Sequence, residues 1–186
     1  GRPAKTSGGM VTIAPMAENR MMDGIEIVET CKELEARGAD VVGMNCFRGP
    51  ATMLPWLKEI RKAVSGHVAA LPVPYRTTEQ EPTFFNLSDH GPCRCPSPHG
   101  RTFPTALDPF YCNRYEIGAF AKEAYGLGVH YLGVCCGASP MLIREVAEAV
   151  GRTTEASRYS EKMANHFLYG TNERIADHIR ALGDRA

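Results

Sequence analysis

Short apolar runs alternate with amphipathic stretches along most of the chain. The apolar runs predict four strands, at residues 11–14, 41–44, 67–71 and 129–134. The amphipathic stretches repeat their apolar residues every three or four positions and predict four helices, between Asp23 and Gly38, from Pro50 to Val64, from Tyr115 to Leu127 and from Pro140 to Val150. Strands that alternate with helices are typical of βα units, so the pattern predicts an α/β fold with a parallel sheet.

Local signals mark the ends of these helices. Asp23 and Glu26 are spaced as in a capping box, and Ser139 is expected to be the N-cap residue before Pro140. Glycines are expected to stop the first three helices, at Gly38, Gly66 and Gly128. The faces expected to be buried are formed by Ile25, Val28, Cys31 and Leu34, by Met53, Leu57, Ile60 and Val64, by Ile117, Phe120, Ala121 and Ala124, and by Leu142, Val146, Ala149 and Val150.

Residues 76–113 interrupt the third unit, between its strand and its helix. This segment is rich in proline, glycine and small polar residues and has no periodicity, which predicts a long surface loop. Loops of this length within a compact domain usually serve a function, for example as lids. We therefore treat the segment as a loop insertion in the βα domain.

The βα pattern ends after residue 151. A single further helix is predicted from Asn172 to Leu182, with Ile175 and Ile179 on its apolar face. We therefore expect a βα domain over residues 1–151 and a C-terminal extension over residues 152–186. The extension is expected to pack on the outside of the domain or to reach a partner subunit in a homo-oligomer.

Charge and composition exclude several classes of partner. The 186 residues include 21 basic and 21 acidic side chains, and this zero net charge offers no attraction to nucleic acid or to anionic membranes. No apolar run approaches the roughly 18 residues of a membrane span. The seven cysteines, an odd number without a signal peptide, are typical of a reducing compartment. We therefore expect a cytoplasmic protein with no nucleic-acid or membrane partner.

An internal repeat indicates where the chemistry lies. Four residues recur ninety positions later in the same spacing, Gly38, Gly43, Cys46 and Pro50 matching Gly128, Gly133, Cys136 and Pro140. Both segments therefore represent the same step of a βα unit, with cysteine where the strand ends. Since sites in parallel α/β folds are built at the C-terminal ends of strands, Cys46, Cys135 and Cys136 are expected to meet there. Three thiolates at about 2.3 Å can hold a tetrahedral Zn²⁺ and leave one position open, as in catalytic zinc sites.

Simpler interpretations exist for the cysteines, because free cysteine is among the residue types most often buried. Cys46 alone would be interpreted as a small buried residue, but the adjacent Cys135–Cys136 pair favours a metal site. Cys31 belongs to a buried helix face, and nothing marks Cys112 as a ligand. A second metal site is a weaker hypothesis, since its ligand types lack a four-ligand spacing: Cys93 and Cys95 with His90 and His99.

Two motifs carry a family resemblance. Val-Gly-Met-Asn-Cys at 42–46 and Leu-Gly-Val-Cys-Cys-Gly at 132–137 resemble the zinc motifs of the homocysteine S-methyltransferase family, most of all its betaine-dependent members. Supporting stretches lie at residues 72–77, 105–110, 121–129 and 156–160. The resemblance implies a (β/α)8 TIM barrel with zinc held by the three cysteines at the ends of its sixth and eighth strands. The four strands here would then be the fifth to eighth, the C-terminal half of the barrel.

The length of the chain agrees with half a barrel. A complete (β/α)8 barrel typically needs about 250 residues, and the 186 residues here include a long loop and a tail. The chain begins with Gly1 rather than methionine and runs almost directly into a strand. We therefore expect it to be part of a longer protein.

The resemblance implies methyl transfer to the thiol of homocysteine, giving methionine, with zinc holding the sulfur as a thiolate. Betaine is the expected donor, with S-methylmethionine or a folate-charged cobalamin as alternatives. A zinc-binding half-barrel without catalytic activity is the alternative from a different class. Asn45 is interpreted either as a substrate-binding residue or as a turn residue.

Tyr75 is the only aromatic residue expected near a strand end. It is interpreted either as a wall of the donor pocket, with its ring against the cationic methyl groups, or as a surface tyrosine. Two positions depart from the family pattern. Val134 replaces a glycine beside the cysteine pair, and Leu71 replaces a glutamine of the vertebrate members. The first narrows access beside the zinc, and the second removes a hydrogen-bonding side chain from the pocket.

Overall fold

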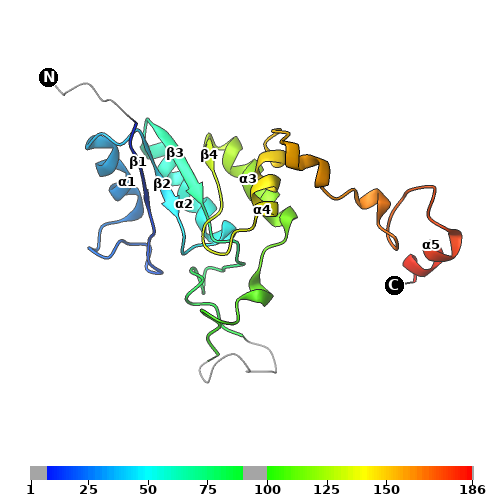
Figure 1. Ribbon diagram of the computed structural model, residues 1–186. Coiled ribbons are helices and arrows are strands. Elements are labelled where there is room, and N and C mark those ends of the chain that lie inside the picture. Colours follow the sequence, from blue (N-terminus) through cyan, green and yellow to red (C-terminus); the bar gives the residue numbers. More distant parts are fainter. Residues whose placement is uncertain (1–7, 90–99, 186) are drawn as a thin grey trace. The chain divides into compact units, whose positions relative to one another are not determined.

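The sheet is parallel and follows the order of the chain. The computed structural model describes residues 8–89 and 100–185 (Figure 1). Its strands are β1 (Met10–Ile13), β2 (Val41–Asn45), β3 (His67–Leu71) and β4 (Tyr131–Leu132). They pair in the order β1-β2-β3-β4, and each pair is parallel. The predicted α/β class and parallel sheet are therefore confirmed.

The fourth strand is shorter than the predicted span of residues 129–134. β4 pairs with β3 only at Tyr131 and Leu132, and it lies at an edge of the described sheet. The chain nevertheless continues beside β3, because Gly133 N–H donates to the Ala70 carbonyl at 3.1 Å.

Four helices follow their strands in the same order. They are α1 (Ile27–Ala36), α2 (Pro50–Ala63), α3 (Arg114–Gly126) and α4 (Pro140–Ala149). Each packs against the next along the chain. Within the described residues, no helix has both the length and the apolar character that a membrane span needs.

The start of α1 differs from the prediction. Asp23 does not cap the helix, because its Oδ1 accepts from Ile25 N–H at 3.1 Å and closes a turn before it. The N-cap residue is Glu26, whose carboxylate pairs with Arg20 at 2.6 Å. Ile25, which was expected to be buried, is consequently 37% exposed, and Ile27 is buried in its place. This turn at Asp23, an Asx turn, determines where the helix begins and therefore which residues face the core. The spacing of apolar residues alone did not reveal it.

The other predicted helix faces are largely confirmed. Both α2 and α3 bury all four of the residues assigned to their inner faces. In α4, Leu142 and Val146 are buried, while Ala149 and Val150 are half-buried. α1, α2 and the strands share one core with Phe120 and Ala124 of α3.

The N-caps of α3 and α4 behave differently. At α3, the Asn113 side chain accepts from Glu116 N–H and the Glu116 carboxylate accepts from Asn113 N–H, forming a capping box that was not predicted. Ser139 is the N-cap residue of α4, as predicted, but it makes no capping hydrogen bond. Its Oγ is buried and has no partner among the described residues.

The described parts of the loop insertion contain more buried structure than a surface loop. Phe84, Leu87 and Leu107 form a second core with Cys46 and Val73 at the ends of the strands. The loop also includes the short 3-10 helix η1 (Asp108–Phe110). Phe84, Phe85 and Leu87 form a short apolar group and Leu107 follows 20 positions later, so no helical or strand period runs through the segment. The prediction therefore missed this core.

Contacts divide the chain after Arg152. The second unit contains η2 (Glu155–Tyr159), η3 (Met163–Asn165) and α5 (Asp177–Gly183). α5 is shorter than the predicted helix from Asn172 to Leu182. The Asn172 carbonyl accepts from Ile175 N–H at 3.1 Å and from Arg180 Nη2 at 2.7 Å, so the first residues form a turn instead.

Candidate metal centre

The three predicted cysteines lie in the segments that follow β2 and β4, the two strands on either side of β3. Cys46 N–H donates to the Leu71 carbonyl at 2.9 Å, and Cys135 N–H donates to the Pro72 carbonyl at 2.8 Å. The chain leaving β3 therefore holds the segment after β2 and the segment after β4 at the same edge of the sheet. Because all strands are parallel, this edge is the one where their carboxyl ends meet.

The thiols lie at the spacing that a shared metal requires. The Sγ atoms of Cys46, Cys135 and Cys136 all lie within 4.8 Å of one another. Cys46 Sγ is 3.5 Å from Cys136 Sγ, and Cys135 Sγ is 3.9 Å from Cys136 Sγ. Tetrahedral zinc with bonds of 2.3 Å separates its sulfurs by about 3.8 Å. The donor set and its geometry therefore fit a tetrahedral metal ion.

The environment of the thiols differs from one side of the cluster to the other. Cys46 is buried, Cys135 is half-buried and Cys136 is exposed. Burial, with smaller contributions from the neighbouring Cys136 and Cys135, raises the pKa of the Cys46 thiol from 9.0 to about 12, although a backbone hydrogen bond from Phe47 lowers it in part. A thiol with this pKa stays protonated at neutral pH unless a cation stabilises the thiolate. The exposed side at Cys136 leaves room for a ligand from solvent.

The backbone around Cys46 adopts an unusual conformation. Cys46 has φ 58° and Phe47 has φ 57°, two consecutive left-handed residues with side chains. Such residues cost about 1–3 kcal/mol each and are concentrated at functional sites. The turn is held by Arg48 N–H, which donates to the Cys46 carbonyl at 2.6 Å, and by Phe84 N–H, which donates to the Phe47 carbonyl at 2.8 Å.

A glycine and two tyrosines shape the turn after the cysteine pair. Gly137 has φ 90°, and its carbonyl accepts from the Tyr111 hydroxyl at 2.8 Å. A Cβ at Gly137 would lie 2.5 Å from the Tyr75 hydroxyl oxygen. The structure therefore places the Tyr75 hydroxyl directly over the turn beside Cys136.

Tyr75 and Asn45 both lie near the thiols. The Tyr75 ring stacks on Phe84 at 5.9 Å and meets Tyr111 edge-on at 5.8 Å. Burial raises the pKa of Tyr75, and Tyr111 raises it further. Asn45 is half-buried at the end of β2, next to Cys46. The structure thus brings both residues to the same edge of the sheet as the three cysteines.

The expectation that Tyr75 is the only aromatic residue near a strand end is wrong. Phe47 lies 4.9 Å from Phe85, and Phe84 lies 4.3 Å from Phe85 and 5.1 Å from Phe103, measured between ring centroids. These rings belong to the same cluster as Cys46 and Cys135 or contact its members. The adjacent phenylalanines in an otherwise polar loop were the available sequence signal.

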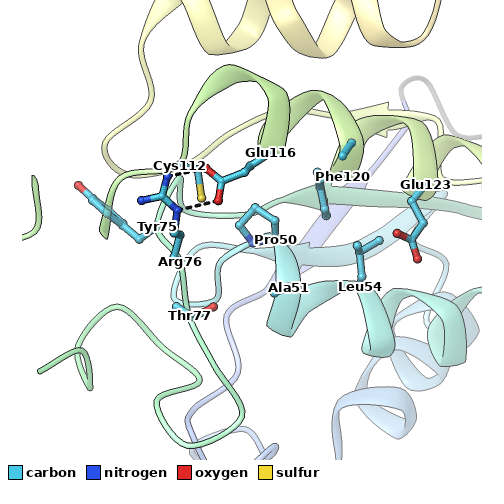
Figure 2. A pocket seen from close by; sticks show the side chains of 11 residues that line it. Pro50, Ala51, Leu54, Tyr75, Arg76, Thr77, Cys112, Glu116, Phe120 and Glu123 are labelled. Atoms are coloured by element: carbon cyan, nitrogen blue, oxygen red, sulfur yellow. Dashed lines mark hydrogen bonds and ion pairs between the residues drawn. The ribbon is translucent and has the colours of Figure 1, made fainter. Parts of the chain in front are cut away.

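A pocket on the helix side of this region is separate from the thiol cluster. It has a volume of about 310 Å³ and lies between α2 and α3 (Figure 2). Arg76 and Glu116 form a two-bond ion pair at one end, at 2.6 and 2.7 Å, which lowers the pKa of Glu116. Tyr75 contributes to its wall, but its lining includes none of the three clustered cysteines.

The remaining cysteines follow the structural interpretation where they are described. Cys31 is fully buried in the main core, as predicted, and Cys112 is buried beside α3. Burial raises the pKa of each thiol to about 12. The hypothetical second metal site, with Cys93 and Cys95, lies outside the described residues.

Comparison with known proteins identifies the family of the chain. The model of the family described as homocysteine S-methyltransferase matches residues 8–150, well over half of the chain. The chain belongs to the homocysteine S-methyltransferase family. All three clustered cysteines lie within the matched segment.

Individual proteins that are similar to the chain support this assignment. Betaine–homocysteine S-methyltransferase 1 from Danio rerio is 34% identical over 154 residues, which cover 81% of this chain and 35% of the relative. The Xenopus tropicalis protein of the same name is 32% identical over 68% of this chain and 30% of its own length. S-methylmethionine–homocysteine S-methyltransferase from Rattus norvegicus is 30% identical over 68% of this chain and 33% of its own length. The chain thus spans about a third of these relatives.

Proposed function

We propose that this chain carries the zinc site of an enzyme that transfers a methyl group to homocysteine and forms methionine. The observation that carries the proposal is the spacing of the Cys46, Cys135 and Cys136 sulfurs, 3.5 and 3.9 Å between neighbours. The same three residues lie at the carboxyl edge of a parallel sheet, where this fold class builds its sites.

The chain's own residues account for the binding and orientation steps. The three cysteine thiolates would hold the ion, and the exposed side at Cys136 would admit the homocysteine thiol. A bound zinc would lower the pKa of that thiol from its ordinary value of about 8.5, so that the thiol would release its proton to solvent and the sulfur would be a thiolate at neutral pH. A sulfur lone pair then forms the new bond to the methyl carbon as the carbon–nitrogen bond of betaine breaks. Its electron pair stays on nitrogen, leaving dimethylglycine, and no general base is needed.

We propose betaine as the methyl donor. Its quaternary ammonium group is attracted by aromatic faces, and Tyr75 with the phenylalanines around Phe84 supplies such faces beside the thiols. A sulfonium donor would be attracted in the same way, so the rings support a cationic methyl donor as a class. The names of the Danio rerio and Xenopus tropicalis relatives favour betaine, and that of the Rattus norvegicus relative supports S-methylmethionine as the alternative.

We propose that the βα domain is the C-terminal half of a (β/α)8 barrel. Consecutive strands and consecutive helices lie in the order of the chain, as they do in half of such a barrel. The five cysteines that the structure describes are free thiols, which supports a reducing, cytoplasmic setting.

The test measures metal content and product formation in the full-length protein that carries this chain. We expect about one zinc per chain in the reduced protein, lost in Cys136→Ser and retained in Cys112→Ser, which makes the same change outside the cluster. Methionine formation should depend on the zinc and should be faster with betaine than with S-methylmethionine. Folded, reduced protein without zinc contradicts the metal site, and zinc without methionine formation from any donor contradicts the catalytic role.

A further inference from the structure

The turn that carries Cys46 also places an arginine inside the protein. Arg48 lies two residues beyond Cys46, and only 2% of its surface is exposed. Its Nη2 donates to three oxygens after β1, Met16 O at 2.8 Å, Ala17 O at 3.3 Å and Asn19 Oδ1 at 2.7 Å. The side chain therefore ties the segment after β1 to the turn after β2.

The backbone of Arg48 joins the same turn to the end of β3. Its N–H donates to the Cys46 carbonyl at 2.6 Å, and its carbonyl accepts from Val73 N–H at 3.0 Å. Arg48 thus connects the segments that follow three neighbouring strands. Because Cys46 and Phe47 both have positive φ, they need surrounding contacts to keep this conformation. The Arg48 backbone makes two of these contacts, and its buried side chain anchors the turn to Met16, Ala17 and Asn19.

The hydrogen bonds of the buried Arg48 guanidinium do not satisfy all of its donors. Arg48 Nε is buried and has no hydrogen-bond partner among the described residues. The acidic residue whose charge acts on the guanidinium is Glu18. A buried donor without an acceptor opposes folding, and an apolar side chain would fill the same space without that penalty. The three hydrogen bonds to the segment after β1 are therefore what an arginine adds at this position.

We propose that Arg48 is a positioning residue for the thiol cluster, holding the turn after β2 so that Cys46 Sγ reaches an ion shared with Cys135 and Cys136. The inference rests on the zinc site proposed above. Arg48 contacts neither the ion nor the substrate in this role, since it acts through the backbone of Cys46. The quantity that it maintains is the 3.5 Å separation of Cys46 Sγ and Cys136 Sγ. Groups that orient metal ligands in this way typically change metal affinity by about 10–100-fold.

The experiment measures zinc affinity and fold stability separately in the full-length protein. Arg48→Met keeps an apolar stem and removes the donors, so zinc binding should weaken by about 10–100-fold in competition with a chromophoric chelator. With Co²⁺ in place of zinc, the thiolate charge-transfer band should shift or weaken, because Cys46 Sγ is displaced. Asn19→Gly removes one acceptor and keeps the backbone at φ 62°, which glycine adopts freely, so a smaller weakening is expected.

Arg61→Met is the matched control. Arg61 donates to the carbonyls of Val64 and Gly66, both at 2.6 Å, just beyond the C-terminal end of α2. Its loss should lower thermal stability but leave zinc affinity and the Co²⁺ spectrum unchanged. Zinc affinity unchanged in Arg48→Met, or equally weakened in Arg61→Met, overturns the positioning role alone. Wild-type protein that binds no zinc overturns the proposed function as well, and Asn19→Gly decides the question if Arg48→Met does not fold.

Discussion

At Gly137, beside the cysteine pair, the missing side chain makes room for Tyr75. Gly137→Ala should destabilise the protein by about 1–3 kcal/mol through its positive φ, and by more through the clash with the Tyr75 hydroxyl. Gly151→Ala is the control, because Gly151 also has a positive φ and its Cβ would meet open space. Urea unfolding should show the larger loss for Gly137→Ala, and Tyr75→Phe should recover part of it. Equal losses in the two alanine variants would argue against the contact.

Cys31 gives the metal-free fold a pH dependence. Burial raises the pKa of its thiol from 9.0 to about 12, so the folded state holds this proton more tightly than the unfolded state. The resulting stability is complete below pH 9.0 and is lost as the pH rises towards 12, at up to about 1.4 kcal/mol per pH unit. Urea unfolding between pH 9 and 11 should show a flatter dependence for Cys31→Ala than for the wild type. Parallel curves would show that Cys31 does not contribute.

At the scale of single elements, the N-cap residues of α3 and α4 are expected to contribute differently to stability, although both are small polar residues. Asn113→Ala should lower the free energy of unfolding by about 1 kcal/mol, because the capping hydrogen bond to Glu116 N–H is lost. Ser139→Ala should have little effect or stabilise slightly, since the Ser139 Oγ is buried without a partner. Denaturant unfolding of both variants provides the comparison. A larger loss for Ser139→Ala would contradict the assignment of the caps.

The helices and strands also show which features of the fold the local sequence pattern predicts. The inner faces of α2 and α3 were predicted residue by residue, because helical periodicity depends only on neighbours in the chain. The predicted start of α1 was wrong, because the Asp23 side chain closes a turn instead of capping the helix. β4 was predicted too long, because the length of a strand depends on its neighbours in the sheet. The predictions failed where a side chain or a strand had a choice of partners.

At the scale of the whole molecule, the C-terminal unit exposes large aromatic side chains. Phe167 is 71% exposed and Tyr169 is 59% exposed, which fits the expectation that this extension reaches a partner subunit. Phe167→Ser combined with Tyr169→Ser should reduce the oligomeric state measured by light scattering. Tyr115→Ser, which removes a 57% exposed ring of the first unit, is the control and should not. Unchanged assembly in the double variant would exclude this patch from the interface.

Local spacing predicts the four βα units, most of the buried helix faces and the three cysteines at strand ends. Each of these depends on the spacing of residues that are close in the chain, or on two copies of one short motif. The resemblance to the family rests on the same local motifs and agrees with the family match over residues 8–150.

Tertiary packing sets the distances between the sulfurs, the aromatic cluster beside them and the contacts of Arg48. Cys46 and Cys136 are 90 residues apart in the chain, and Arg48 and Met16 are 32 apart. Such pairs leave no period in the sequence, because they meet only when parallel strands align and bring their carboxyl ends to one edge. Local spacing therefore predicted which residues carry the chemistry, and packing determined how they are held.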